Sequence, residues 1–366
     1  MDSFKGSIGA GRACQIVARV IAEHVPAAHL VIKPMADGGE GTADAIFAST
    51  PGRWLRRTVT GPLPDTRVKA GFAWFANTRT ALVEMASASG LQLLSPRQYN
   101  PMKTTTFGTG QLIKAALKYQ PRKVLLAVGG SATVDGGIGA AAALGWEFLN
   151  NKGQPVPLTG RGLSQIISVV KPRKPIPARV EVLCDVDNRL CGKHGAARIY
   201  APQKGATPRM VERLEKNLEH LAGLIKDRLG KDINVPGAGA AGGLAAGALA
   251  FMDAVLVSGP KTVINFTHLA DELADADWII TGEGCFDRQS LYGKVISAVA
   301  EAAAGFGVPV AVIAGKVRLS KSAYQKMGIH TALACKPPRM SFDHALAHST
   351  DLLRKATRKF VCRNLI

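Results

Sequence analysis

Short apolar runs that end beside glycine limit the fold of this chain more than any other feature. Three such runs precede a glycine, at residues 124–128, 278–281 and 308–313. Apolar runs of this length, bounded by glycine, are typical of strands buried on both faces. Helical periodicity lies elsewhere, over 11–24 and 208–229, where Thr207 and Pro208 form a typical helix start. Strands alternating with helices predict an α/β fold with largely parallel sheets.

The pattern changes near residue 55, which suggests a domain crossing. Residues 50–77 contain several prolines and glycines, and 56–59 and 67–70 are typical of strands with one polar face. A chain of 366 residues is long enough for two or three domains.

Charge and cysteine usage exclude several classes of protein. The chain carries a net charge of +19, and residues 316–366 hold eleven basic residues against two acidic ones. Aromatic residues make up only 6%, which argues against nucleic-acid binding as the main function. The six cysteines form no C-x-x-C pair, so we expect neither a zinc knuckle nor a thioredoxin motif. No apolar leader or span is apparent, so we expect a cytoplasmic protein without a membrane partner.

Four segments combine glycine with hydroxyl and carboxylate side chains, at 2–7, 35–42, 129–137 and 281–284. Glycine lets backbone N–H groups approach an anion closely, and a following helix N-terminus adds its dipole. Carboxylates in such turns are consistent with Mg²⁺ beside phosphate, or with a base that accepts a hydroxyl proton. A single turn of this kind is usually only a tight turn, but four of them indicate phosphoryl transfer.

Other motifs are less specific. Asp185 and Asp187 follow an apolar run, and one of them could be a base or a metal ligand while the other caps the turn. Lys204 before Gly205 suits a phosphate or carboxylate, and a solvated surface lysine is the alternative. The G-x-G-x-x-G at 237–242 follows no apolar strand, so we expect close backbone packing or a phosphate contact rather than dinucleotide binding. His344 and His348 lack a third metal ligand, and the basic helix expected over 352–360 is typical of a solvated surface.

The ordered motifs together resemble the bacterial glycerate kinase family of type 1. The resemblance covers about residues 2–315 and is carried by segments 2–7, 34–42, 84–91, 105–110, 129–137, 184–188, 202–206, 237–243 and 281–284. It implies ATP-dependent phosphorylation of D-glycerate, usually to 2-phosphoglycerate, with 3-phosphoglycerate as the alternative. It also implies a Rossmann-like domain with a parallel sheet, formed by 1–55 and 265–366, and an inserted α/β domain at 56–264. The active site is expected in the cleft between these domains, and a homodimer is left open.

The resemblance also implies roles for individual residues. For D-glycerate we expect binding by Ser3, Lys5, Ser7 and Lys204. For catalysis we expect Asp185 or Asp187 as the base, together with Lys5. For the phosphates of ATP we expect Gly130, Ser131, Thr133, Gly136, Gly137, Gly282 and Lys294. For Mg²⁺ we expect Asp37, Glu40 and Glu283.

Two departures from the family pattern motivate an alternative. Family members usually begin with a short apolar strand before the Asp2-Ser3-Phe4-Lys5 segment, and Cys285-Phe286 replaces a usual Arg-Leu pair. The alternative is a catalytically impaired protein of kinase fold with a binding or regulatory role.

Overall fold

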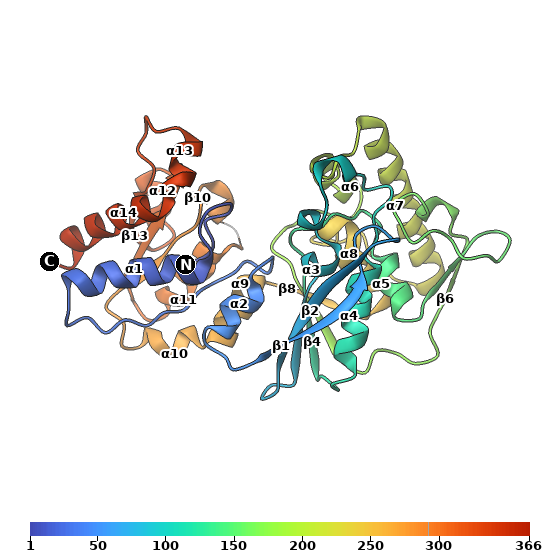
Figure 1. Ribbon diagram of the computed structural model, residues 1–366, viewed down its shortest axis with the longest axis horizontal. Helices are drawn as coiled ribbons and strands as arrows, with labels where there is room; N and C mark the ends of the chain where they lie inside the picture. The colour runs from blue at the N-terminus through green and yellow to red at the C-terminus, as the bar shows by residue number, and fades with distance from the viewer. Residues whose placement is uncertain (292) are drawn as a thin grey trace. The chain divides into compact units, whose positions relative to one another are not determined.

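The computed structural model describes residues 1–291 and 293–366, which form two compact units (Figure 1). Unit 1 comprises Met1–Asp37, Gly41–Pro51 and Ser258–Ile366, and unit 2 comprises Gly38–Glu40 and Gly52–Val257. The domain limits expected from the sequence stay a prediction, because compactness alone does not show that a unit folds independently.

Unit 2 is built on a six-stranded sheet in the order β1-β2-β3-β4-β7-β8. The strands β3, β4, β7 and β8 run parallel, while β1 and β2 form an antiparallel edge. A separate antiparallel pair is formed by β5 and β6. The bounds are β1 Arg53–Thr60, β2 Arg67–Phe75, β3 Thr80–Glu84, β4 Lys123–Ala127, β5 Glu147–Leu149, β6 Ser168–Val170, β7 Arg179–Leu183 and β8 Val255–Val257.

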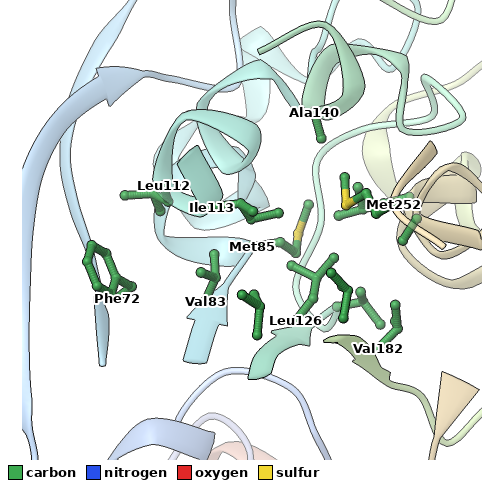
Figure 2. Packing of buried hydrophobic residues seen from close by; sticks show 14 of the residues in the cluster. Phe72, Val83, Met85, Leu112, Ile113, Leu126, Ala140, Val182 and Met252 are labelled. Atoms are coloured by element: carbon green, nitrogen blue, oxygen red, sulfur yellow. The ribbon is translucent and has the colours of Figure 1, made fainter. Parts of the chain in front are cut away.

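Helices cover this sheet and bury its apolar side chains. Figure 2 shows Leu112 and Ile113 of α4 in one buried cluster with Val83 of β3 and Leu126 of β4. A second cluster packs α5, α6, α7 and α8 against one another. The bounds are α3 Ala86–Ser89, α4 Phe107–Leu117, α5 Ile138–Ala143, α6 Ala196–Tyr200, α7 Pro208–Leu229 and α8 Ala240–Phe251.

The ends of α7 follow from its sequence. The Thr207 side chain accepts a hydrogen bond from the Met210 backbone N–H, and Pro208 occupies the first turn, where its missing N–H is not needed. Gly230 ends the helix in a left-handed conformation that glycine adopts without strain. The helix expected over 208–229 is therefore confirmed.

Unit 1 contains a parallel three-stranded sheet in the order β13-β11-β9 and a short parallel pair of β10 and β12. Its strands are β9 Ile279–Thr281, β10 Cys285–Phe286, β11 Val310–Ala314, β12 Lys316–Val317 and β13 Ile329–Ala334. Its helices are α1 Ala10–His24, α2 Thr42–Phe47, α9 Gly259–Thr267, α10 Leu269–Leu273, α11 Val295–Ala304, α12 Lys321–Gln325, α13 Phe342–Ala347 and α14 Ser349–Asn364.

The C-terminal helix α14 corrects one expectation. It lies beside α1 (Figure 1) and buries Leu353 and Phe360 in the core that α1 shares with β11. Only its other face, with Arg358 and Lys359, is exposed. The interpretation of this helix as a solvated surface was incomplete, because its charged residues masked a regular apolar stripe.

The predicted α/β class with largely parallel sheets is confirmed, and all three glycine-bounded apolar runs are strands. Among the described residues, no helix combines the length and apolar character that a membrane span requires.

Candidate active site

The carboxyl edge of the unit 2 sheet gathers several of the segments singled out in the sequence. Because β3, β4 and β7 are parallel neighbours, the segments that follow them at 85–90, 128–137 and 184–188 emerge at one edge. Backbone hydrogen bonds join the first two segments, from Leu91 N to Gly130 O at 2.9 Å and from Ala132 N to Ser89 O at 2.9 Å. Ligands of open parallel sheets bind at this edge.

Lys204 lies behind the loop that follows β4. Its side chain is buried, and Nζ donates hydrogen bonds to Ser131 Oγ at 2.6 Å and to the Thr133 carbonyl at 2.7 Å. Burial lowers the pKa of Lys204 to about 7, and the charge of Asp135 opposes that shift. The alternative of a solvated surface lysine is wrong, and a direct bond to substrate would have to compete with these two acceptors.

Asp135 is a buried carboxylate that organises the same loop. Its Oδ2 accepts hydrogen bonds from Thr106 N and Thr106 Oγ1, both at 2.8 Å, and its Oδ1 accepts one from Gly137 N at 3.1 Å. Burial raises the pKa of Asp135 despite these bonds. Asp135 lies in the segment 129–137, but its role could not be predicted because its partner Thr106 is distant in sequence.

Gly136 and Gly137 have structural roles that differ from the predicted one. Gly136 N donates to Gly242 O at 3.2 Å, and Gly137 N donates to Asp135. Because both N–H groups already have partners in a buried segment, the phosphate-binding role predicted for these two glycines is not supported. Thr133 is also fully buried, and its hydroxyl donates to Ala241 O at 3.5 Å.

The glycines at 237–243 serve close packing against this loop. A Cβ on Gly242 would lie 2.0 Å from the Thr133 carbonyl oxygen, and one on Gly247 would lie 2.5 Å from the Gly136 carbonyl oxygen. Gly242 also has a left-handed backbone, with φ at +65°. The close packing expected for the G-x-G-x-x-G segment is confirmed.

The remaining predicted residues of unit 2 lie at or near the same edge. Asp185 is half-buried and Asp187 is exposed, in the irregular segment after β7. Since the strand ends at Leu183, strict alternation of the two side chains no longer applies. Gly130 is exposed, and a Cβ on it would lie 4.0 Å from Glu40 Oε2. The roles of Asp185, Asp187, Gly130 and Glu40 stay predictions.

A second candidate region lies within unit 1, at the carboxyl ends of β9, β11 and β13. A cavity of about 600 Å³ opens there, lined by residues of the segment 2–7 and of the loops after these strands. Its cationic lining residues are Lys5, Lys294, Lys316, Arg318 and Lys336, and its acidic ones are Asp2, Asp37, Glu283 and Asp287. The volume is in the range of small-molecule sites.

The carboxylates of this cavity influence one another. Burial raises the pKa of Asp2 to about 6, and the neighbouring charge of Asp37 adds to the shift. Burial also raises the pKa of Glu283, which accepts a short hydrogen bond from Ser290 Oγ. Lys5 Nζ lies 3.1 Å from Asp37 Oδ2, and this partner raises the pKa of Lys5. Asp2 lies in the segment 2–7, but the sequence pattern did not predict a role for it.

The predicted metal ligands do not form a complete protein site. In the part of the chain that the structure describes, no group of three or more His, Cys, Asp or Glu side chains could hold a metal ion. Asp37 and Glu283 both line the unit 1 cavity, whereas Glu40 belongs to unit 2. Two carboxylates are nevertheless sufficient for Mg²⁺ when phosphate and water supply the other ligands. The rings of His344 and His348 stack with their centroids 4.1 Å apart. They belong to no group of three metal-binding side chains among the described residues.

Three other predicted residues line the unit 1 cavity, and one does not. Ser3, Ser7 and Lys294 are on the cavity wall, with Ser7 Oγ donating to Phe4 O at 3.0 Å. Gly282 is buried outside the lining, and its carbonyl accepts a hydrogen bond from Asp2 N at 2.9 Å. Its role is to let β9 approach β11, because a Cβ there would lie 2.0 Å from Ile313 O.

Cys285 lies on the same wall, and its Sγ is 3.6 Å from Asp287 Oδ2. Arg318 on the adjacent strand end is close enough to oppose the rise in the pKa of the Cys285 thiol that burial causes. A guanidinium is therefore present beside Cys285.

Comparisons with known proteins agree on one family. The family model described as the glycerate kinase family matches residues 1–364. A "glycerate kinase" from Halalkalibacterium halodurans is 42% identical over 98% of this chain and 95% of its own length. A "glycerate 2-kinase" from Escherichia coli K12 is 38% identical over 98% of this chain and 94% of its own length. The solved structure of "putative glycerate kinase 2" from Salmonella typhimurium LT2 superposes with a TM-score of 0.84 at 38% identity, covering 99% of this chain and 96% of that one.

Proposed function

Because the chain belongs to the glycerate kinase family and is therefore a kinase, we propose that it transfers the γ-phosphoryl group of ATP to the 2-hydroxyl of D-glycerate. The observation that carries the proposal is the unit 1 cavity, where five cations converge at the carboxyl ends of parallel strands. Cations at such an edge attract and neutralise polyphosphate, which is the main electrostatic need of phosphoryl transfer.

In unit 1, Lys294, Lys316, Arg318 and Lys336 would contact the phosphates of ATP. The carboxylates Asp37 and Glu283 would hold Mg²⁺ from one side, and phosphate oxygens would complete its ligands. When bound, Mg²⁺ supplies charge neutralisation to the transferring group. Lys5, already paired with Asp37, would meet an anionic group of either reactant.

In unit 2, Asp185 and Asp187 are the candidates for the base that accepts the hydroxyl proton of glycerate. Both follow β7 at the edge where Ser131 lies after β4. Removal of a true general base should lower kcat by about 10²–10⁴. We expect such a loss in Asp185→Ala or in Asp187→Ala, but not in both, as measured by steady-state kinetics. If both purified variants turn over at the wild-type rate, the base lies elsewhere.

The reading of this chain as a catalytically impaired protein receives no support. One of its two motivations was the missing arginine at position 285, yet Arg318 lines the same cavity as Cys285. A coupled assay of ADP release tests the proposal, with D-glycerate as the acceptor and glycerol as the control. We expect ADP release only with D-glycerate, and its loss when EDTA removes Mg²⁺. Release that does not depend on D-glycerate would contradict the assigned substrate.

A further inference from the structure

The buried ammonium of Lys204 is the feature that the proposed reaction leaves unused. Lys204 is 1% exposed, which is rare for lysine, and it ends a short 3₁₀ helix at Pro202–Lys204. Burial of a lysine is costly unless its charge is used, so its two hydrogen bonds require an explanation.

The hydrogen bond from Lys204 determines what the Ser131 hydroxyl can do. A protonated lysine can only donate, so Ser131 Oγ accepts from Nζ at 2.6 Å and its own proton must point elsewhere. Among the described residues, this oxygen has no other hydrogen-bond partner. Ser131 follows β4 at the carboxyl edge of the sheet and is largely buried, with 9% of its surface exposed.

The surroundings hold this pair in place. The Thr133 carbonyl accepts the second hydrogen bond from Nζ. The backbone of Gly242 lies against this carbonyl, and only a residue without a Cβ fits there. Ser131 itself is paired across the backbone with Gly90. An anion that arrived beside Ser131 would favour the charged form of Lys204, which strengthens the orientation of the hydroxyl.

We propose that Lys204 is a positioning residue that fixes the Ser131 hydroxyl as a hydrogen-bond donor to an anionic oxygen of the reactants. This inference rests on the proposed function and deepens it. The oxygen belongs either to the carboxylate of glycerate or to the phosphoryl group that is transferred. Lys204 itself contacts neither reactant.

A double-mutant cycle tests the proposal through kcat and the KM values for D-glycerate and ATP. We expect Ser131→Ala and Lys204→Met each to lose about 10²-fold in kcat/KM, the cost of removing one oriented donor. The kcat/KM of the double variant should be no lower than that of the less active single variant, because Lys204 acts through Ser131. Losses that multiply in the double variant would overturn the proposal.

Matched controls separate orientation from general damage. Ser164→Ala and Lys216→Met make the same chemical changes at exposed positions of unit 2 and should retain wild-type kinetics. Lys204→Met leaves two buried acceptors without their donor, so circular dichroism checks that the variant is folded. Ser131→Ala keeps Lys204 bonded to Thr133, so its kinetics test the donor role even if Lys204→Met is unfolded.

Chemical rescue adds a readout that a structural role alone would not give. Lys204→Cys is made in a background whose six native cysteines are replaced by alanine or serine, so that 2-bromoethylamine applied to the unfolded chain alkylates position 204 alone. After refolding, the side chain carries an ammonium at nearly the same position. We expect recovery of most of the kcat/KM of the parent background, and no recovery when Ser131→Ala is also present. Recovery of kcat/KM that does not depend on Ser131 would overturn the proposal that Lys204 acts through Ser131.

The two KM values identify the oxygen. A loss that falls on the KM for D-glycerate assigns the carboxylate, and a loss that falls on kcat assigns the transferring phosphoryl group. Unchanged kinetics in Ser131→Ala, with active wild type, would refute this inference and leave the proposed function standing. A wild type that does not phosphorylate D-glycerate would instead refute the proposed function.

Discussion

The carboxyl group of Asp2, buried in the unit 1 cavity, destabilises the fold when it is ionised. Its pKa is raised to about 6, first by burial and then by Asp37. A folded pKa above the unfolded one means that this group stabilises the fold at low pH, below about 4. That contribution is lost as the pH rises through about 6, where the buried carboxyl ionises.

Asp2→Asn should therefore stabilise the protein most at neutral pH. The amide can still accept the hydrogen bond that Ser3 N donates to Asp2 Oδ1 at 2.6 Å. We expect the difference in unfolding free energy between variant and wild type to grow by about 2–3 kcal/mol between pH 4 and pH 7. Urea denaturation at a series of pH values measures this, and a difference that is constant with pH would contradict the assignment.

At the scale of single residues, the sequence predicted which residues lie near the candidate site but not which contacts their side chains and backbone groups make. Lys204 was a candidate ligand because it stands before a glycine. Its burial could not be predicted, because Ser131 and Thr133 are about seventy positions away. For the same reason the sequence assigned Gly136 and Gly137 to phosphate binding, although Gly136 N donates to Gly242 O and Gly137 packs against Gly247.

At the scale of elements, the kinked start of α8 supports the loop after β4. Ala241, Gly242 and Gly243 all have positive φ there, and the Thr133 carbonyl lies against Gly242. Gly242→Ala should destabilise the protein by about 2–4 kcal/mol, from left-handed strain and a backbone clash. Urea denaturation measures the change.

Gly223→Ala is the matched control, because Gly223 lies within α7 and no atom lies within 4 Å of an added Cβ. This variant should be more stable than wild type by about 0.5–1 kcal/mol, from helix propensity. Equal effects of the two substitutions would show that close packing at Gly242 is not important.

The helices and strands themselves were largely predictable from the sequence, but the pairing between strands was not. Apolar runs bounded by glycine identified β4, β9 and β11. Periodicity identified α1, and periodicity together with Thr207 and Pro208 identified α7. The parallel pairing of β4 with β7, which brings 128–137 and 184–188 to one edge, joins strands that are distant in the sequence. A local pattern does not show which distant strands pair.

At the scale of the whole molecule, the net charge of +19 has a partly local explanation. Three of the basic residues in the C-terminal segment, Lys316, Arg318 and Lys336, line the unit 1 cavity. We therefore expect part of this excess charge to serve a small anionic ligand, which composition alone could not distinguish from a nucleic acid.

Arg318→Met should weaken ATP binding by about 10- to 100-fold, the cost of one hydrogen bond to a charged group. Arg358→Met removes the same charge from the exposed face of α14, outside the cavity lining, and should leave the affinity near that of wild type. Isothermal titration calorimetry with Mg²⁺ and ATP measures both. Equal weakening in the two variants would mean that only net charge matters.

The most direct measurement is NMR of the product formed from D-glycerate and ATP by the full chain. Phosphorus and carbon spectra distinguish a phosphate on the 2-hydroxyl from one on the 3-hydroxyl. We expect 2-phosphoglycerate together with an equal amount of ADP. A reaction mixture that contains only unchanged D-glycerate, or only the 3-phosphate, would contradict it.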